Sequence, residues 1–188
     1  QRQEDHAGAG AGAPDGKLYG AKRPMKGGLG SSSLTVAGVT VGAIVAVNAV
    51  GDVVDPATGH VLARARTADG KMLLDTRAAI LAGDLPTSMR EGAATTIGLV
   101  ATDARLTKAQ AQKMAQTAHD GLARTINPIH TMLDGDTVFA LGTGASGKPA
   151  NMMLLGVMAA EAMAIAVQRA ILAARALEGY PAAVDFIA

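Results

Sequence analysis

The order of the apolar segments is the feature that most constrains how this chain folds. Residues 34–51 and 95–104 are rich in Val and Ile and have strand character, as do residues 137–144. Helical patterns cover residues 106–126, after the second strand, and residues 151–179, after the third. The order strand, strand, helix, strand, helix is typical of a layered domain in which helices cover a sheet. We therefore predict an α+β or α/β fold.

The core that this composition predicts is built from small and aliphatic side chains. Hydrophobic residues make up 49% of the 188 residues, but aromatic residues only 2%. Residues 34–51 are apolar without consistent alternation, which predicts one strand buried on both faces. The apolar run from Met152 to Ala160 ends at Glu161, so it is too short to span a bilayer and predicts a buried helix.

Local signals mark the ends of the helices. Thr107 and Gln110 have the spacing of a capping box at the start of helix 106–126. Gly179 is predicted to end the last helix in the C′ position. A short helix is expected near residues 75–82, within an otherwise irregular surface connection over residues 64–92.

Charge and residue counts exclude several classes of partner and chemistry. The net charge is +1, so nothing indicates a nucleic-acid or membrane partner. The absence of cysteine excludes a disulfide scaffold, a thiol nucleophile and a Cys-ligated metal. His119 and His130 have no third ligand nearby in the sequence, so we expect neither a metal nor another cofactor. The polar N-terminal segment favours a cytoplasmic location.

The first third of the chain contains two Gly-rich segments. Residues 1–17 are of low complexity, and we expect a flexible lead or the cut end of a longer protein. The segment Tyr19–Ser33 is predicted to form a loop, in which Lys26 precedes Gly27 and Gly28. Glycines allow backbone amides to turn toward one anion or oxyanion, and a lysine beside them can hold negative charge. The alternative is a flexible basic loop.

Three further polar residues stand next to strands. Asp134 and Asp136 flank a glycine before the strand at 137–144, so their carboxylates are candidates to converge and to raise one pKa. Spacing alone favours ordinary Asp-Gly turn chemistry instead. Asn48 ends an apolar strand, where its carboxamide either donates to an oxyanion or caps the turn at Gly51.

Thr95 begins a strand in the sequence "EGAATTIGLVATDA". A hydroxyl inside a chain is a poor nucleophile without a neighbouring base. If the peptide bond before Thr95 breaks, its own α-amine, with a pKa near about 8, becomes that base. The alternative is a β-branched residue at a strand start, which is common.

Four segments in this order resemble one family: "MKGGLGSSS", "VGAIVAVNAVGDVVDPATG", "TTIGLVATDARLTKAQAQKMAQTAHDGLARTI" and "HTMLDGDTVFALGTG". Together they are similar to the self-processing peptidases typified by the L-aminopeptidase/D-Ala-esterase. Within that family the chain looks nearest to the nylon-oligomer (6-aminohexanoate-oligomer) endohydrolase branch, because it has Thr at the cleavage point and the Asp-Gly-Asp segment.

The resemblance implies an αββα sandwich of the N-terminal-nucleophile type and a precursor cut once, between Ala94 and Thr95. Residues 18–188 would then form a single domain, with residues 18–94 the end of the α chain and residues 95–188 the β chain. Carried over by motif, the nucleophile is Thr95. The other residues carried over are Lys26, Asn48, Asp134 and Asp136, with Gly27 and Gly28 as loop support.

The implied activity is hydrolysis of a short peptide or amide oligomer by a homo-oligomer of αβ units. Two departures from the family pattern open an alternative. Ala94 stands where the family has Asn, and the lead before the Lys-Gly-Gly loop is short. The alternative is a catalytically silent, unprocessed relative or fragment that acts as a scaffold. A further alternative is an acyltransferase resembling the ornithine acetyltransferases.

Overall fold

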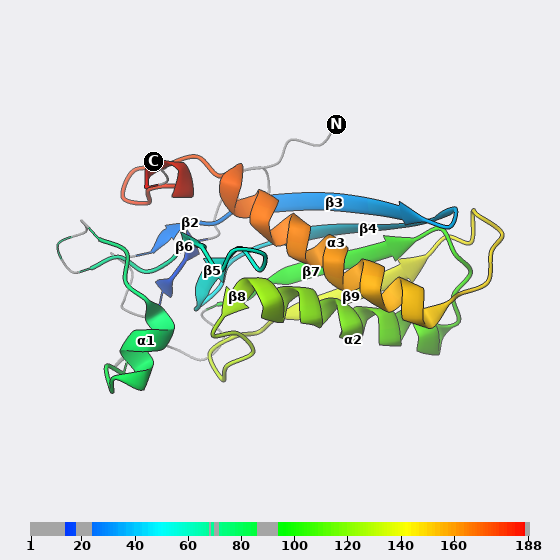
Figure 1. The fold of residues 1–188 in the computed structure, drawn as a ribbon, viewed down its shortest axis with the longest axis horizontal. Coiled ribbons are helices and arrows are strands. Elements are labelled where there is room, and N and C mark those ends of the chain that lie inside the picture. Colours follow the sequence, from blue (N-terminus) through cyan, green and yellow to red (C-terminus); the bar gives the residue numbers. More distant parts are fainter. Residues whose placement is uncertain (1–13, 18–23, 68, 70–71, 86–93, 187–188) are drawn as a thin grey trace.

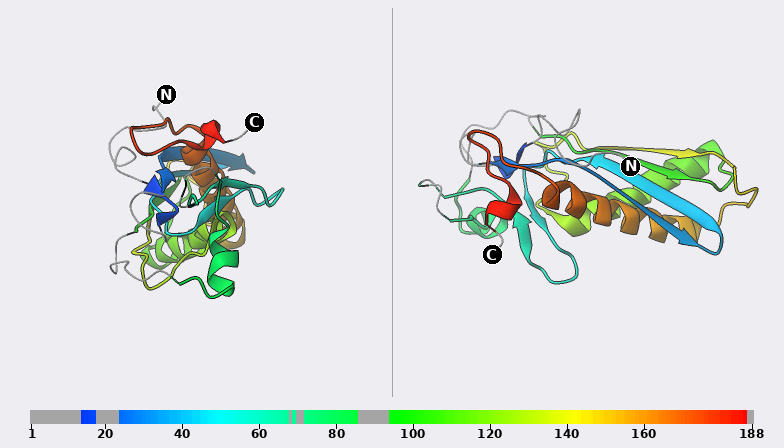
Figure 2. Two further views of the ribbon diagram at one scale, coloured as in Figure 1. Left: turned by 90° about the vertical axis from the view of Figure 1, so that its left-hand side faces the viewer. Right: turned by 90° about the horizontal axis from the view of Figure 1, so that it is seen from above.

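The computed structural model describes residues 14–17, 24–67, 69, 72–85 and 94–186. Its main sheet has the strand order β3-β4-β7-β9, in which only the β7–β9 pair is parallel. Two long helices lie side by side on one face of this sheet (Figures 1 and 2). These six elements are β3 (Leu29–Val36), β4 (Val39–Ala46), β7 (Ile97–Thr102), α2 (Lys108–Thr125), β9 (Thr137–Gly142) and α3 (Met152–Leu172).

Smaller elements gather at one end of the sheet (Figure 1). They form a two-stranded sheet β1-β2 and a three-stranded sheet β6-β5-β8, with one short helix beside them. Their bounds are β1 (Pro14–Asp15), β2 (Met25–Lys26), β5 (Asp52–Val54), β6 (Val61–Ala63), α1 (Thr76–Leu81), β8 (Ile126–Asn127) and the 3₁₀-helix η3 (Ala183–Asp185). The short helix was predicted and is confirmed, whereas the sequence patterns missed these strands because each is only two or three residues long.

The single strand predicted at 34–51 is wrong, because it contains a turn. β3 and β4 form a hairpin closed by Ala37 and Gly38, with φ angles of 51° and 70°. Two consecutive positive φ angles are those of a type I′ turn, for which Asn-Gly rather than Ala-Gly is the usual sequence signal. Burial along β4 then alternates, so the strand is fully covered on its helix side only.

The segment Leu29–Ser33, predicted as part of a loop, is strand β3. Its small residues allow α3 to pack directly on the strand. A Cβ on Gly30 would lie 2.0 Å from the Ala166 carbonyl oxygen, and the Ser32 hydroxyl donates to the Ala162 carbonyl at 2.6 Å. The glycine and serines therefore serve close helix–sheet contact here.

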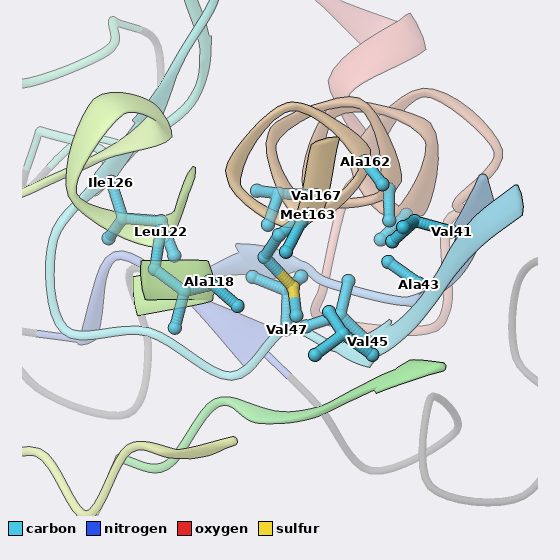
Figure 3. Packing of buried hydrophobic residues seen from close by; sticks show 14 of the residues in the cluster. Val41, Ala43, Val45, Val47, Ala118, Leu122, Ile126, Ala162, Met163 and Val167 are labelled. Atoms are coloured by element: carbon cyan, nitrogen blue, oxygen red, sulfur yellow. The ribbon is translucent and has the colours of Figure 1, made fainter. Parts of the chain in front are cut away.

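The core lies between the sheet and the two helices (Figure 3). Val41, Ala43 and Val45 of β4 point toward α3. The fully buried Met163 reaches down from α3 between the elements. Aliphatic and thioether side chains thus fill the interior, as the composition predicts. Burial of each Leu, Val or Met side chain stabilises the folded state by about 1.5–3 kcal/mol.

Both helices begin where the sequence predicts, but the second ends earlier. Thr107 and Gln110 form the predicted capping box of α2. α3 ends at Leu172 instead of continuing to Gly179, which lies in a turn with φ 81°. The chain has to leave the helix there so that the Pro181 carbonyl can accept from the Lys26 amide at 2.8 Å. Tertiary pairing therefore overrides the helical propensity of residues 173–178.

The face of the main sheet opposite the helices is only partly covered by the described residues. Ile97 and Phe139 point outward there and are 51% and 59% exposed. The apolar segment was predicted to be too short to span a bilayer, which is wrong, because helix α3 as a whole is long and apolar enough to do so. The predicted buried helix is nevertheless found, since 61% of its apolar 18-residue stretch is buried inside the fold. The described residues thus provide the main sheet and a helical layer on one of its faces, which is part of the sandwich that the resemblance implies.

The end of the segment predicted as a flexible lead belongs to the fold. Within residues 1–17, residues 14–17 are described, and Asp15 pairs with Met25 and is completely buried. The hydrogen bond from the Ala49 amide to the Asp15 carboxylate, 2.8 Å long, anchors it. Residues 1–13 lie outside the described residues, and the division into a lead and one domain stays a prediction.

We predict that Gly121→Ala destabilises the protein although alanine favours helices. A Cβ at Gly121 of α2 would lie 2.3 Å from the Ala160 carbonyl oxygen of α3, so the helices must separate. We expect a loss of about 1–3 kcal/mol in the free energy of unfolding, measured by urea denaturation. The control is Gly156→Ala in α3, where a Cβ meets only ordinary contacts at 3.5 Å or more. Equal stability of the two variants would contradict this account of the packing.

Candidate active site

Thr95 lies half-buried just before β7 and is held by its backbone. Its amide donates to the Asn48 carbonyl at 3.0 Å. Its hydroxyl donates to the carbonyl of the preceding residue, Ala94, at 2.7 Å. The hydroxyl oxygen is therefore beside the peptide bond that self-processing would have to break.

The segment Asp134–Asp136 lies directly beside Thr95, as the spacing in the sequence predicts. Ala94 and Asp134 form a parallel β-bridge, and the Gly135 amide donates to the Ala94 carbonyl at 2.8 Å. A Cβ on Gly135 would lie 2.8 Å from the Thr95 Oγ1, so this close approach requires glycine. The Ala94 carbonyl oxygen thus accepts from two donors at once.

The two carboxylates of this segment are held differently. Asp134 accepts from the Thr131 amide at 3.0 Å and from its hydroxyl at 2.7 Å. Asp136 accepts from the Thr96 amide at 2.7 Å, and its second oxygen is buried without a hydrogen-bond partner among the described residues. Burial raises the pKa of Asp136, and the charge of Asp134 adds to this rise. The sequence predicted that the neighbouring carboxylate raises one of the two pKa values. The pKa of Asp136 is raised, but burial is the main cause.

Asn48 follows β4 and faces the same site. Its carbonyl accepts from the Thr95 amide and, at 3.4 Å, from the Lys17 ammonium. Its carboxamide oxygen is buried and has no hydrogen-bond partner in the described part of the chain. An unpaired buried oxygen is costly, so this oxygen is suited to accept a hydrogen bond from a ligand, whereas the predicted oxyanion contact would use the carboxamide nitrogen.

Lys26 is buried, and its ammonium donates to the Gly27 carbonyl at 2.9 Å. The Gly28 carbonyl accepts from the Val47 amide at 2.9 Å, which joins the loop to the end of β4. The contacts found at Gly27 and Gly28 thus use their carbonyl groups, whereas the predicted anion site would use their amides. The functional roles of these three residues stay predictions.

The sequence patterns missed an acid and a base beside the site. Burial raises the pKa of Asp15 to about 7, although the hydrogen bond from the Ala49 amide and the charges of Lys17 and Lys26 lower it. Burial also lowers the pKa of Lys17, against the charges of Asp15 and Asp134. Asp15 stands in a Pro-Asp-Gly segment of low complexity, where nothing local signals that the carboxylate is buried.

This arrangement has groups that can support acyl transfer. It combines a hydroxyl beside a carbonyl, a backbone amide on that carbonyl oxygen, and two neighbouring carboxylates. Among the described residues no group of three His, Asp or Glu side chains is placed to hold a metal ion.

Comparisons with known proteins identify the family. The family model of peptidase family S58 matches residues 2–184. An uncharacterized aminopeptidase of Mycobacterium leprae is 43% identical over 188 residues, which cover 93% of this chain and 50% of the relative. The 6-aminohexanoate-oligomer endohydrolase of Kocuria sp. is 30% identical over 173 residues, covering 85% of this chain and 48% of that protein. The chain belongs to peptidase family S58, which confirms the predicted resemblance.

A solved structure confirms the fold class. The L-aminopeptidase D-Ala-esterase/amidase of Ochrobactrum anthropi, described as a variant of the Ntn-hydrolase fold, aligns with a TM-score of 0.59 and 20% identity. The alignment covers 92% of this chain and 46% of that structure. The chain likewise spans about half the length of the curated relatives it matches. It therefore has part of this fold, consistent with the single helical layer.

We predict that Asp15 makes stability depend on pH. The pKa of Asp15 is raised in the folded state, so protonated Asp15 stabilises the fold fully below about pH 4, and this stabilisation is lost as the pH rises to about 7. Asp15→Asn stays neutral and should not lose it. The free energy of unfolding of the native chain should therefore fall relative to that of Asp15→Asn between these pH values, on the order of 4 kcal/mol for a pKa shift of about three units. Urea unfolding at pH 4 and pH 8 measures the difference. The control is Asp84→Asn at an exposed position, and equal pH slopes of the native chain and Asp15→Asn would refute the assignment.

Proposed function

We propose that this chain is the nucleophile-bearing part of a self-processing amide hydrolase of family S58. The observation that carries the proposal is the Thr95 hydroxyl, 2.7 Å from the Ala94 carbonyl oxygen that the Gly135 amide also holds. An acyl transfer to this hydroxyl needs a nearby carbonyl and a donor for the developing oxyanion, and both are supplied.

In the proposed self-cleavage, Thr95 Oγ1 attacks the Ala94 carbonyl carbon. The C–N bond to the Thr95 nitrogen breaks, and the hydroxyl proton passes through a neighbouring carboxylate to that nitrogen. Asp136 is suited to this transfer because its raised pKa favours holding a proton. Water then hydrolyses the ester, which leaves the Ala94 carboxylate and a free Thr95 α-amine.

The Ala94 position does not argue against cleavage. Its carbonyl is held by the Gly135 backbone, which acts whatever side chain precedes Thr95. Its methyl group is fully buried beside Val50, with Ile80 and Leu133 packed against them. A carboxamide in this apolar cluster would be costly to bury, so alanine suits the site.

After cleavage the Thr95 α-amine would serve as the base for attack on a substrate amide. Asn48 would donate to the oxyanion, Lys26 would orient the nucleophile, and Asp134 and Asp136 would position the substrate amine and transfer protons. The proposed substrates are short peptides or amide oligomers with a free amino end. The names of the relatives, an aminopeptidase and a 6-aminohexanoate-oligomer endohydrolase, support this class.

We further propose that the whole protein works as a cytoplasmic homo-oligomer of αβ units. This rests on the resemblance to the family and on the partly uncovered sheet face, with Ile97 and Phe139 directed outward. Apolar sheet surface of this kind is normally covered by another layer.

The test is an intact-mass measurement of the chain during incubation at neutral pH. We expect two products, one ending at Ala94 and one beginning at Thr95. Thr95→Ala should abolish the cut because it removes the nucleophile. Thr96→Ala, one residue further along, is the control and should keep it. A native chain that stays uncut would refute self-processing and favour the catalytically silent alternative.

A second prediction concerns Gly135. Gly135→Ala places a methyl group within 2.8 Å of the Thr95 Oγ1 and displaces the hydroxyl from the Ala94 carbonyl. Because misplacement by about 1 Å costs about 100-fold in rate, we expect cleavage to slow by that order. The rate is measured by mass spectrometry, with Gly156→Ala as the control and circular dichroism to verify folding. Unchanged cleavage would show that Gly135 is not part of the machinery.

A further inference from the structure

Two histidines extend the site toward the surface. His119 lies in α2, and His130 lies in the loop between β8 and β9. The Nδ1 of His119 is 2.9 Å from the Nε2 of His130, and that same Nε2 is 4.0 Å from the Oδ2 of Asp136. Three titratable groups therefore form a continuous series from a helix to the buried acid.

The exposure of these groups differs in a way that matters for proton transfer. The side chain of Asp136 is 2% exposed, and its Oδ2 has no hydrogen-bond partner among the described residues. The side chain of His130 is 40% exposed. A buried acid that has to lose its proton to solvent before it can act as a base needs a partner that reaches solvent. A shift of about 1 Å would bring the His130 nitrogen within hydrogen-bond distance of this oxygen.

The backbone conformation of His130 also indicates that surrounding residues hold it in place. Its φ is 55°, in the left-handed region that is uncommon for residues other than Gly, although His, like Asn and Asp, is found there more often than most. Such a conformation persists when the surroundings hold it in place. The His119 contact is one interaction that holds the ring in this place.

We propose that His130 is a positioning residue through which the Asp136 carboxyl exchanges its proton with solvent, and that His119 holds the His130 ring in place. This rests on the proposed function, because in self-cleavage Asp136 first acts as a base, so a carboxyl that holds a proton has to release it to solvent before that step.

The charges around the pair set the direction of the effect. Burial and the charge of His130 lower the pKa of His119, while Asp136 and Asp120 raise it. The lowered pKa favours the neutral form of His119. Burial and the charge of Asp134 raise the pKa of Asp136, whereas a charge on His130 lowers it. Loss of His130 therefore leaves Asp136 protonated up to a higher pH, with less of the base form at neutrality.

The first experiment tests the contact without relying on cleavage. In uncut Thr95→Ala, the ring resonances of His130 are recorded by NMR with and without Asp136→Asn. Removing a carboxylate whose oxygen is 4.0 Å from the His130 Nε2 should shift these resonances. The exposed His60, in the turn after β5, is the internal control, and its resonances should stay in place. Unchanged His130 resonances would overturn the proposal.

The second experiment measures the rate of self-cleavage against pH. His130→Asn keeps a residue that tolerates positive φ. We expect the rate at pH 7 to fall about tenfold or more and its rise with pH to move to higher pH. His60→Asn is the matched control. In His130→Gly, added imidazole should restore part of the rate.

The outcomes separate the two proposals. If His130→Asn and His60→Asn share the native rate and pH profile, the role of His130 is refuted while self-processing stands. If the native chain is never cut, self-processing fails, and the requirement for proton exchange at Asp136 fails with it. The NMR comparison with Asp136→Asn still decides whether His130 and Asp136 interact.

Discussion

The parallel pairing of β7 with β9 is the constraint on which the site depends. Parallel neighbours start at the same edge of a sheet, and α2 is the crossover that brings the chain back to this edge. The Ala94–Asp134 bridge extends the pairing beyond the strands. It delivers the Gly135 amide to the Ala94 carbonyl and places Asp136 at the Thr96 amide. The parallel pairing that joins β7 and β9 thus also positions the groups of the candidate site.

Elements with strong local signals could be predicted from the sequence, and those set by distant contacts could not. The capping box at Thr107 marks the start of α2 within the chain itself. The Ala37–Gly38 turn lacks the usual residues of its type, so the hairpin was not recognised. The end of α3 depends on the pairing of Pro181 with Lys26, residues far apart in sequence. No local pattern carries that information.

The candidate site divides in the same way. Spacing and family motifs pointed to Thr95 and to the Asp134–Asp136 segment, and the structure places them together. The Gly135 amide was missed because a backbone donor has no sequence signature. Asp15 was missed because its burial depends on how the N-terminal segment packs against Ala49. His130 gained significance only when its distance to Asp136 was known.

The close contact of α3 with β3 changes which substitutions in the core should cost most stability. In most interiors the costly changes are truncations of large side chains, which leave cavities. Here the tightest points are occupied by the smallest residues, since the Gly30 backbone lies against Ala166 and Ala170. A complete substitution scan of this interface should therefore find its least tolerant positions among glycine, serine and alanine. Related sequences can be expected to exchange their aliphatic residues far more freely than these small ones.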